Sequence, residues 1–195
     1  MDLVQAASTY ARDLLGGEEA PLWLHVKKVV EVCQQLAPPA HTDQEVLLLA
    51  AYLHDIGYAT GPALDHERRS ADMARQFLRD RGVPPDRVEL VVQTILAHVF
   101  PVFGQERDNL SLEAKILYDA DKLQRASGLA ALGVIWEAAR KDPDGSMAGF
   151  RSLLSQARKQ QEQVYGSLYT DRARQLACEG YRAALNYIDA LNRTL

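Results

Sequence analysis

The sequence has very little cysteine: Cys33 and Cys178 are the only two among 195 residues. Two thiols are too few for a disulfide framework or for a zinc site built from thiolates. Cys33 lies among Val29, Val30 and Leu36, which is typical of a small core side chain. Any metal site in this chain must therefore be built from imidazole and carboxylate ligands.

Long apolar runs and a strong charge of one sign are also missing. No uninterrupted apolar stretch approaches the length of a membrane span, and the N-terminal residues lack the basic start and apolar core of a secretory signal. A net charge of −4 gives no reason to expect binding to a nucleic-acid duplex or to an anionic membrane. We therefore expect a cytoplasmic protein without membrane contact, compatible with a homodimer. A local basic cluster could still bind a small phosphorylated substrate.

Helical periodicity dominates what is present, and no convincing period-two strand occurs. The hydrophobic content of 47% and the charged content of 25% are ordinary for a soluble globular protein. We expect one domain over residues 1–195 with an all-α fold, a bundle of roughly eight or nine helices. The expected helices begin near residues 2, 21, 42, 65, 84, 111, 129, 147 and 170.

The stretch VLLLAAYLHDIGY, residues 46–58, organises the chain. Thr42 is the expected cap of its helix, with Glu45 completing a capping box, and Gly57 is the expected stop. His54 shares a helical face with apolar residues three, four and seven positions earlier, so it points inward. A buried polar group costs several kcal/mol (roughly 2–7) unless it is paired or binds a metal. The alternative is a core histidine hydrogen-bonded to Asp55.

Other helices also offer nitrogen or oxygen ligands on apolar stripes. His25 and Asp121 do so from the second and sixth expected helices, and His98 from the fifth. His66 stands in the first turn of the fourth helix. A lone case is more often structural, but joint occurrence favours a metal site. Imidazole and carboxylate ligands suit Mn, Mg, Fe, Co, Ni or Zn.

These residues carry a resemblance to a known family. His25, then His54-Asp55 in YLHDIGY, then Asp121 in ILYDADKL, resemble the H…HD…D signature of the HD-domain superfamily of metal-dependent phosphohydrolases. The likeness covers about residues 20–130 and leaves 131–195 as scaffold helices. It implies an all-α HD-domain bundle in which those four residues bind one divalent metal. Asp121 rather than Asp119 is taken as the ligand, because the family's last Asp commonly lies in an ADxL context.

The resemblance also implies alternatives for His66 and His98. In dinuclear HD proteins such histidines bind a second metal, whereas in mononuclear nucleotide-processing members they face the phosphates or the attacking water. The spacing slightly favours the second arrangement, with both rings several ångströms further out. Tyr58 replaces the Lys usual after HDIG in cyclic-dinucleotide phosphodiesterases, and the Glu-Asp pair of alarmone hydrolases is absent, so neither activity is favoured.

The preferred hypothesis is a metal-dependent phosphohydrolase, with manganese among the candidate metals, acting on a phosphate ester or anhydride, most plausibly in a nucleotide. Asp55 would bind the metal and orient water, and Glu67 is a candidate general acid or base. Lys122 and Arg68 or Arg69 are candidate phosphate contacts, although both arginines oppose the helix dipole where they stand. The plainer interpretation of each basic residue is solvated surface, and that of Glu67 is a carboxylate in the first turn of a helix.

Two other classes of function remain open. A dinuclear iron oxygenase would use six such ligands and would consume dioxygen. The other class is a regulatory module that has kept the scaffold and lost turnover. All four core ligand positions are filled and nothing resembles a fused effector domain, which argues against this class.

Overall fold

The computed structural model describes residues 2–99, 109–124, 133, 136, 140 and 146–194. Within these residues the secondary structure is helical and contains no strand, so the prediction of an all-α fold is confirmed. The helix expected from residue 129 lies largely outside the described residues. The helices are α1 (Leu3–Leu14), α2 (Pro21–Leu36), α3 (Gln44–Leu53), the 3₁₀ turn η1 (Ile56–Ala59), α4 (His66–Arg79), α5 (Pro85–Leu96), α6 (Leu112–Leu123), α8 (Met147–Ser167) and α9 (Asp171–Thr194).

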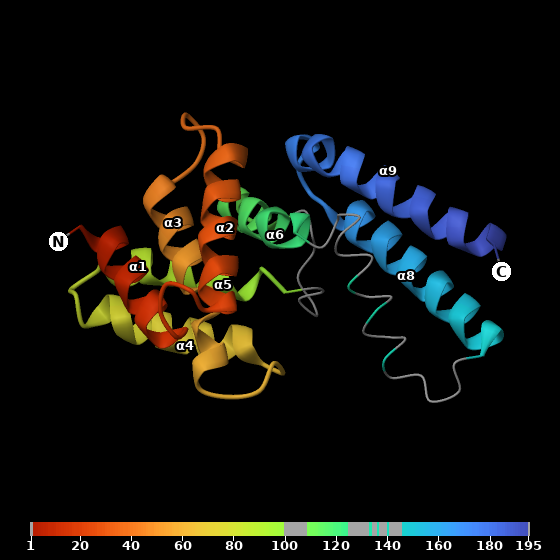
Figure 1. The fold of residues 1–195 in the computed structure, drawn as a ribbon. Helices are drawn as coiled ribbons and strands as arrows, with labels where there is room; N and C mark the ends of the chain where they lie inside the picture. Colours follow the sequence, from red (N-terminus) through yellow and green to blue (C-terminus); the bar gives the residue numbers. More distant parts are fainter. Residues whose placement is uncertain are drawn as a thin grey trace. The chain divides into compact units, whose positions relative to one another are not determined.

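Helix α3 is the centre of the first compact unit, Met1–Ala120 (Figure 1). It packs against α1, α2 and α5, and α4 packs against both α5 and η1. Leu47, Leu49 and Leu53 are almost completely buried, as expected for a helix that is apolar on every side. The His-Asp pair at the end of α3 is therefore held by a rigid element.

Helix α2 begins with Pro21 at its first turn, where a missing N–H is tolerated. Its buried side chains recur at helical spacing along one stripe, and Val26, Val29 and Cys33 are fully buried. This stripe fixes the rotation of α2. His25, next to Val26, is thereby turned toward the end of α3.

The expected N-cap of α3 is wrong by one residue, and the expected capping box of Thr42 and Glu45 is wrong with it. Asp43, not Thr42, is the N-cap, and its carboxylate accepts a hydrogen bond from the Val46 N–H at 3.1 Å. The Thr42 hydroxyl instead donates to the Pro38 carbonyl. Asp43 prevails because Arg87 and Glu113, distant in sequence, also bind it. Sequence spacing alone could not distinguish two adjacent capping residues.

Gly57 does not end α3, as the sequence suggested. The helix ends at Leu53, and Gly57 lies within η1, three residues before the segment leaves the turn at Thr60. A Cβ at Gly57 would stand 2.3 Å from the His66 carbonyl oxygen and 2.8 Å from the Ser70 nitrogen. Glycine is required because η1 runs directly against the first turn of α4.

The second compact unit is Asp121–Leu195, and its main feature is the helical pair α8 and α9 (Figure 1). Leu154, Ala157 and Ile188 form its buried cluster. The division between the units falls within α6, so Asp121 continues a helix whose earlier residues belong to the first unit. None of the helices in the described ranges is both long and apolar enough to be a candidate membrane span.

Candidate metal centre

The Asp55 carboxylate lies at the centre of four imidazole rings. It follows the end of α3 at φ −113° and ψ 5°, a sparsely populated conformation common at active sites. Its Oδ2 lies 3.3 Å from His25 Nε2 and 3.4 Å from His54 Nε2. Its Oδ1 lies 3.4 Å from His66 Nε2 and 3.5 Å from His98 Nε2. Each carboxylate oxygen therefore faces one pair of histidines.

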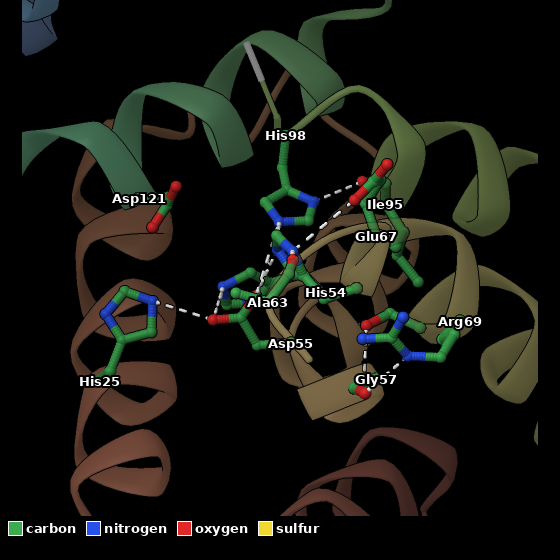
Figure 2. Close-up of polar contacts among 12 residues, drawn as sticks. His25, His54, Asp55, Gly57, Ala63, Glu67, Arg69, Ile95, His98 and Asp121 are labelled. Carbon is green, nitrogen blue, oxygen red and sulfur yellow. Dashed lines mark hydrogen bonds and ion pairs between the residues drawn. The ribbon is translucent and has the colours of Figure 1, made fainter. Parts of the chain in front are cut away.

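A separate carboxylate, that of Asp121, lies near His25 and His54. His25, His54 and Asp121 each offer one ligand atom, and these atoms lie within 4.8 Å of one another. Figure 2 shows His25, Asp55, His98 and Asp121 pointing toward a common region. The structure thus brings together the four residues of the expected ligand set. A second group with the same spacing consists of His54, Asp55 and His98.

Three of the four rings are held in the same way. The Nδ1 atoms of His54, His66 and His98 lie 2.8, 2.8 and 2.5 Å from the carbonyl oxygens of Ala51, Ala63 and Ile95, each three residues earlier. A carbonyl can only accept, so Nδ1 carries the proton in each ring. Each neutral ring then presents Nε2 as an acceptor toward Asp55. Such carbonyl partners are typical of metal-binding histidines.

This donor set fits a divalent cation. In the neutral state Asp55 Oδ1 and the Nε2 atoms of His66 and His98 are all acceptors, and the two nitrogens are only 3.2 Å apart. Acceptors at this separation repel one another unless a proton or a cation lies among them. Imidazole nitrogens and carboxylates are common ligands of Mn, Fe, Co, Ni and Zn.

Electrostatics keep Asp55 ionised. Burial raises the pKa of its carboxyl. When the rings take up a second proton, on Nε2, the charge of His54 and the hydrogen bonds that the other three rings then donate outweigh burial and hold the pKa of Asp55 well below its usual value. Burial lowers the pKa of His66, while the contacts with Asp55 and the Ala63 carbonyl raise it more, with a net increase. Asp55 is therefore a carboxylate at neutral pH.

The remaining candidates from the sequence differ in position. His66 and His98 were expected several ångströms further out, but their Nε2 atoms lie as close to Asp55 as those of His25 and His54. The reason is that α4 packs against both η1 and α5. Glu67 lies 3.6 Å from His66 Nδ1, on the side of the ring that faces away from Asp55. It is thus placed to orient His66 rather than to face the metal group.

Lys122 and Arg68, the two basic residues expected to contact phosphate, differ in burial. Lys122 is buried, and its ammonium contacts the Asp121 carboxylate. Arg68 has an exposed side chain in the first turn of α4. Arg68 is therefore accessible from solvent, whereas Lys122 is placed to orient the Asp121 carboxylate.

Sequence reasoning missed the groups that support the rings. Tyr58 stacks on His66 with ring centroids 4.3 Å apart, and Arg69 and Ser70 bind the backbone of η1. One signal was available: His54 directly follows the last residue of α3, and His98 lies two residues after the last residue of α5. The last carbonyls of a helix have no partner within it and can accept from such a ring. The contacts of Arg69 have no comparable signal.

Comparison with known families matches residues 22–126 to the HD domain, more than half of the chain. A search of curated protein sequences finds no significant match. Among solved structures, Bacillus subtilis YpgQ in complex with ADP is 22% identical, with a TM-score of 0.71, and the alignment covers 99% of this chain and 95% of that one. An HD-superfamily hydrolase from Bacillus thuringiensis is 17% identical, with a TM-score of 0.69 and coverages of 98% and 95%.

The Lin1889 protein from Listeria innocua is 16% identical, with a TM-score of 0.70 and coverages of 98% and 96%. At these identities the three structures show a common fold. The family match is independent of them and contains His25, His54, Asp55 and Asp121. The chain belongs to the HD domain family.

Proposed function

We propose that this protein is a divalent-metal-dependent phosphohydrolase that acts on a nucleotide. The observation that carries the proposal is the Asp55 carboxylate, ionised and shared between two pairs of imidazole nitrogens. His25, His54, Asp55 and Asp121 would hold the cation. When bound, such a cation supplies Lewis-acid polarisation of a phosphoryl oxygen and acidifies water toward neutral pH.

The chain's own residues supply the rest. Asp55 holds negative charge at the centre of the site, because its pKa is far below neutral. His66, with its pKa raised, retains a proton at higher pH than an ordinary imidazole and can donate it to a phosphate oxygen. Its side chain is 13% exposed, compared with 2% for His98, so it is the more accessible of the two to a substrate. Arg68, exposed in the same first turn, is a candidate phosphate contact.

A nucleotide substrate is supported by likeness alone. YpgQ, which shares the fold over nearly the whole chain, has been solved in complex with ADP. The presence of a bound nucleotide in that protein makes nucleoside di- and triphosphates the first substrates to test. Manganese is the first metal to test, as one of several that bind imidazole and carboxylate ligands together.

The testing experiment uses metal-free protein reloaded with Mn²⁺. Nucleoside mono-, di- and triphosphates are each supplied, and phosphate and pyrophosphate are measured separately, which also identifies the bond cleaved. We expect metal-dependent release from at least one nucleotide and none from Asp55→Ala. Bound Mn²⁺ without any release from nucleotides or simple phosphate esters would contradict the proposal.

A second candidate is a dinuclear iron oxygenase, favoured by the pair His66 and His98 facing Asp55 Oδ1. In that case the two groups around Asp55 would hold two iron ions. Protein reloaded with Fe²⁺ would then consume dioxygen in the presence of its substrate. A regulatory module would bind metal and nucleotide but release no product in either assay.

A further inference from the structure

Arg69 holds the loop that precedes α4. Its guanidinium donates from Nε to the Gly57 carbonyl at 3.1 Å and from Nη1 to the Leu64 carbonyl at 2.8 Å. Its Nη2 donates to the Pro62 carbonyl. These three carbonyls span the loop from the end of the His-Asp turn to the start of α4. Figure 2 shows Arg69 beside Gly57.

The Gly57 peptide is bound from both sides by adjacent residues of α4. Its N–H donates to the Ser70 hydroxyl at 2.8 Å, while its carbonyl accepts from Arg69. Gly57 is two residues after Asp55, and Arg69 is three residues after His66. These bonds therefore join the segment that carries Asp55 to the helical turn that carries His66.

The same loop also holds the His66 ring. His66 Nδ1 donates to the Ala63 carbonyl, and Arg69 binds the carbonyls on either side of Ala63. Gly61 allows this arrangement, since a Cβ there would lie 3.2 Å from the Arg69 Cζ and Nε atoms. One guanidinium thus holds the loop residues on both sides of the carbonyl that binds the His66 ring.

We propose that Arg69 is a positioning residue that sets His66 Nε2 opposite Asp55 Oδ1. A cation in the first turn of a helix interacts unfavourably with the helix dipole. The hydrogen bonds to the loop carbonyls offset this cost for Arg69. Lysine could not replace it, because one ammonium on a flexible stem cannot reproduce a planar fork that reaches three carbonyls. The effect on turnover rests on the proposed function; the effect on the loop does not.

The first test is independent of activity. Hydrogen exchange of the segment 56–66 is compared in wild type, Arg69→Met, Arg69→Lys and the control Arg79→Met. Arg79 is exposed at the last residue of α4, about 15 Å further along the same helix. We expect faster exchange in both Arg69 variants and wild-type exchange in the control. Wild-type exchange in Arg69→Met, or full protection in Arg69→Lys, would overturn the proposal.

The second test is a double-mutant cycle on kcat/KM with His66→Ala. Arg69→Met should lower kcat/KM about ten- to a hundredfold, as removal of residues that orient ligands does. In the His66→Ala background the same change should have little further effect, because its target ring is gone. Equal losses in both backgrounds would show that Arg69 does not act through His66. If wild type has no metal-dependent turnover, the proposed function fails, and hydrogen exchange alone decides whether Arg69 holds the loop.

Discussion

His66 Nε2 lies 3.2 Å from His98 Nε2, and in both rings the other nitrogen donates to a backbone carbonyl. Two neutral rings held in this way present two acceptors to each other, with Asp55 Oδ1 beside them. The repulsion among these acceptors is removed if His66 Nε2 carries a proton, as the raised pKa of His66 indicates. A second cation bound among them would remove it as well. The number of cations is therefore decided on the Oδ1 side of Asp55.

We expect His66→Ala and His98→Ala each to reduce turnover and still bind one Mn²⁺ per chain, because His25, His54, Asp55 and Asp121 remain. The measurement is Mn²⁺ content by mass spectrometry after gel filtration, together with nucleotide turnover. Wild type with two Mn²⁺ per chain, and loss of one in either variant, would instead show that the histidine pair forms a second metal site.

Removal of the central carboxylate should have a much larger effect. In Asp55→Ala we expect loss of bound Mn²⁺ and a fall in turnover of several orders of magnitude, since charge and ligand are removed together. Circular dichroism should show a largely helical protein. The matched control is Asp72→Ala, which removes a carboxylate that is 78% exposed on α4. Near-normal turnover of Asp55→Ala would refute the assigned role.

Gly57→Ala should destabilise the protein by about 1–3 kcal/mol or more, because its new methyl group would overlap backbone atoms of His66 and Ser70. Gly166→Ala is the control, since a Cβ there meets nothing within 4 Å and the residue lies inside α8. That change should stabilise α8 by about 0.5–1 kcal/mol. Urea unfolding followed by circular dichroism measures both. Equal effects of the two substitutions would argue against close contact between η1 and α4.

Arg87 makes the stability of the first unit depend on pH. Its hydrogen bond lowers the pKa of Asp43 below the ordinary 3.8, against the opposing effect of partial burial. A lowered pKa means that this stabilisation is fully present above 3.8 and is lost as pH falls through the folded pKa. Because the pair is partly exposed, we expect Arg87→Met to lower stability at pH 6 by up to about 1 kcal/mol.

The difference between wild type and Arg87→Met should then shrink as the pH falls below 3.8 and Asp43 becomes protonated. Urea unfolding from pH 6 to pH 3 measures it, with Arg79→Met as a charge-matched control. A difference that stays constant over this range would mean that Arg87 acts through packing and not through its carboxylate partners Asp43 and Glu45.

The sequence alone determined the helical fold and the inward position of the site residues. Apolar residues at helical spacing place His25 and His54 on buried faces, and this local periodicity needs no knowledge of neighbours. The H…HD…D pattern likewise identified the family, while its choice of Asp121 over Asp119 as a ligand stays a prediction. The sequence did not reveal that Asp43 rather than Thr42 is the N-cap of α3, because the residues that bind Asp43, Arg87 and Glu113, lie on α5 and α6.

Only the tertiary structure decided which oxygen of Asp55 each ring faces. His66 and His98 are 32 residues apart, and their separation depends on how α4 packs against α5 and η1. Arg69 illustrates the same limit. From the sequence it is a cation placed against the helix dipole, and its three carbonyl partners exist only once the loop has folded back over the first turn of α4. Periodicity specifies a direction from a helix axis, whereas distances between elements are set by packing.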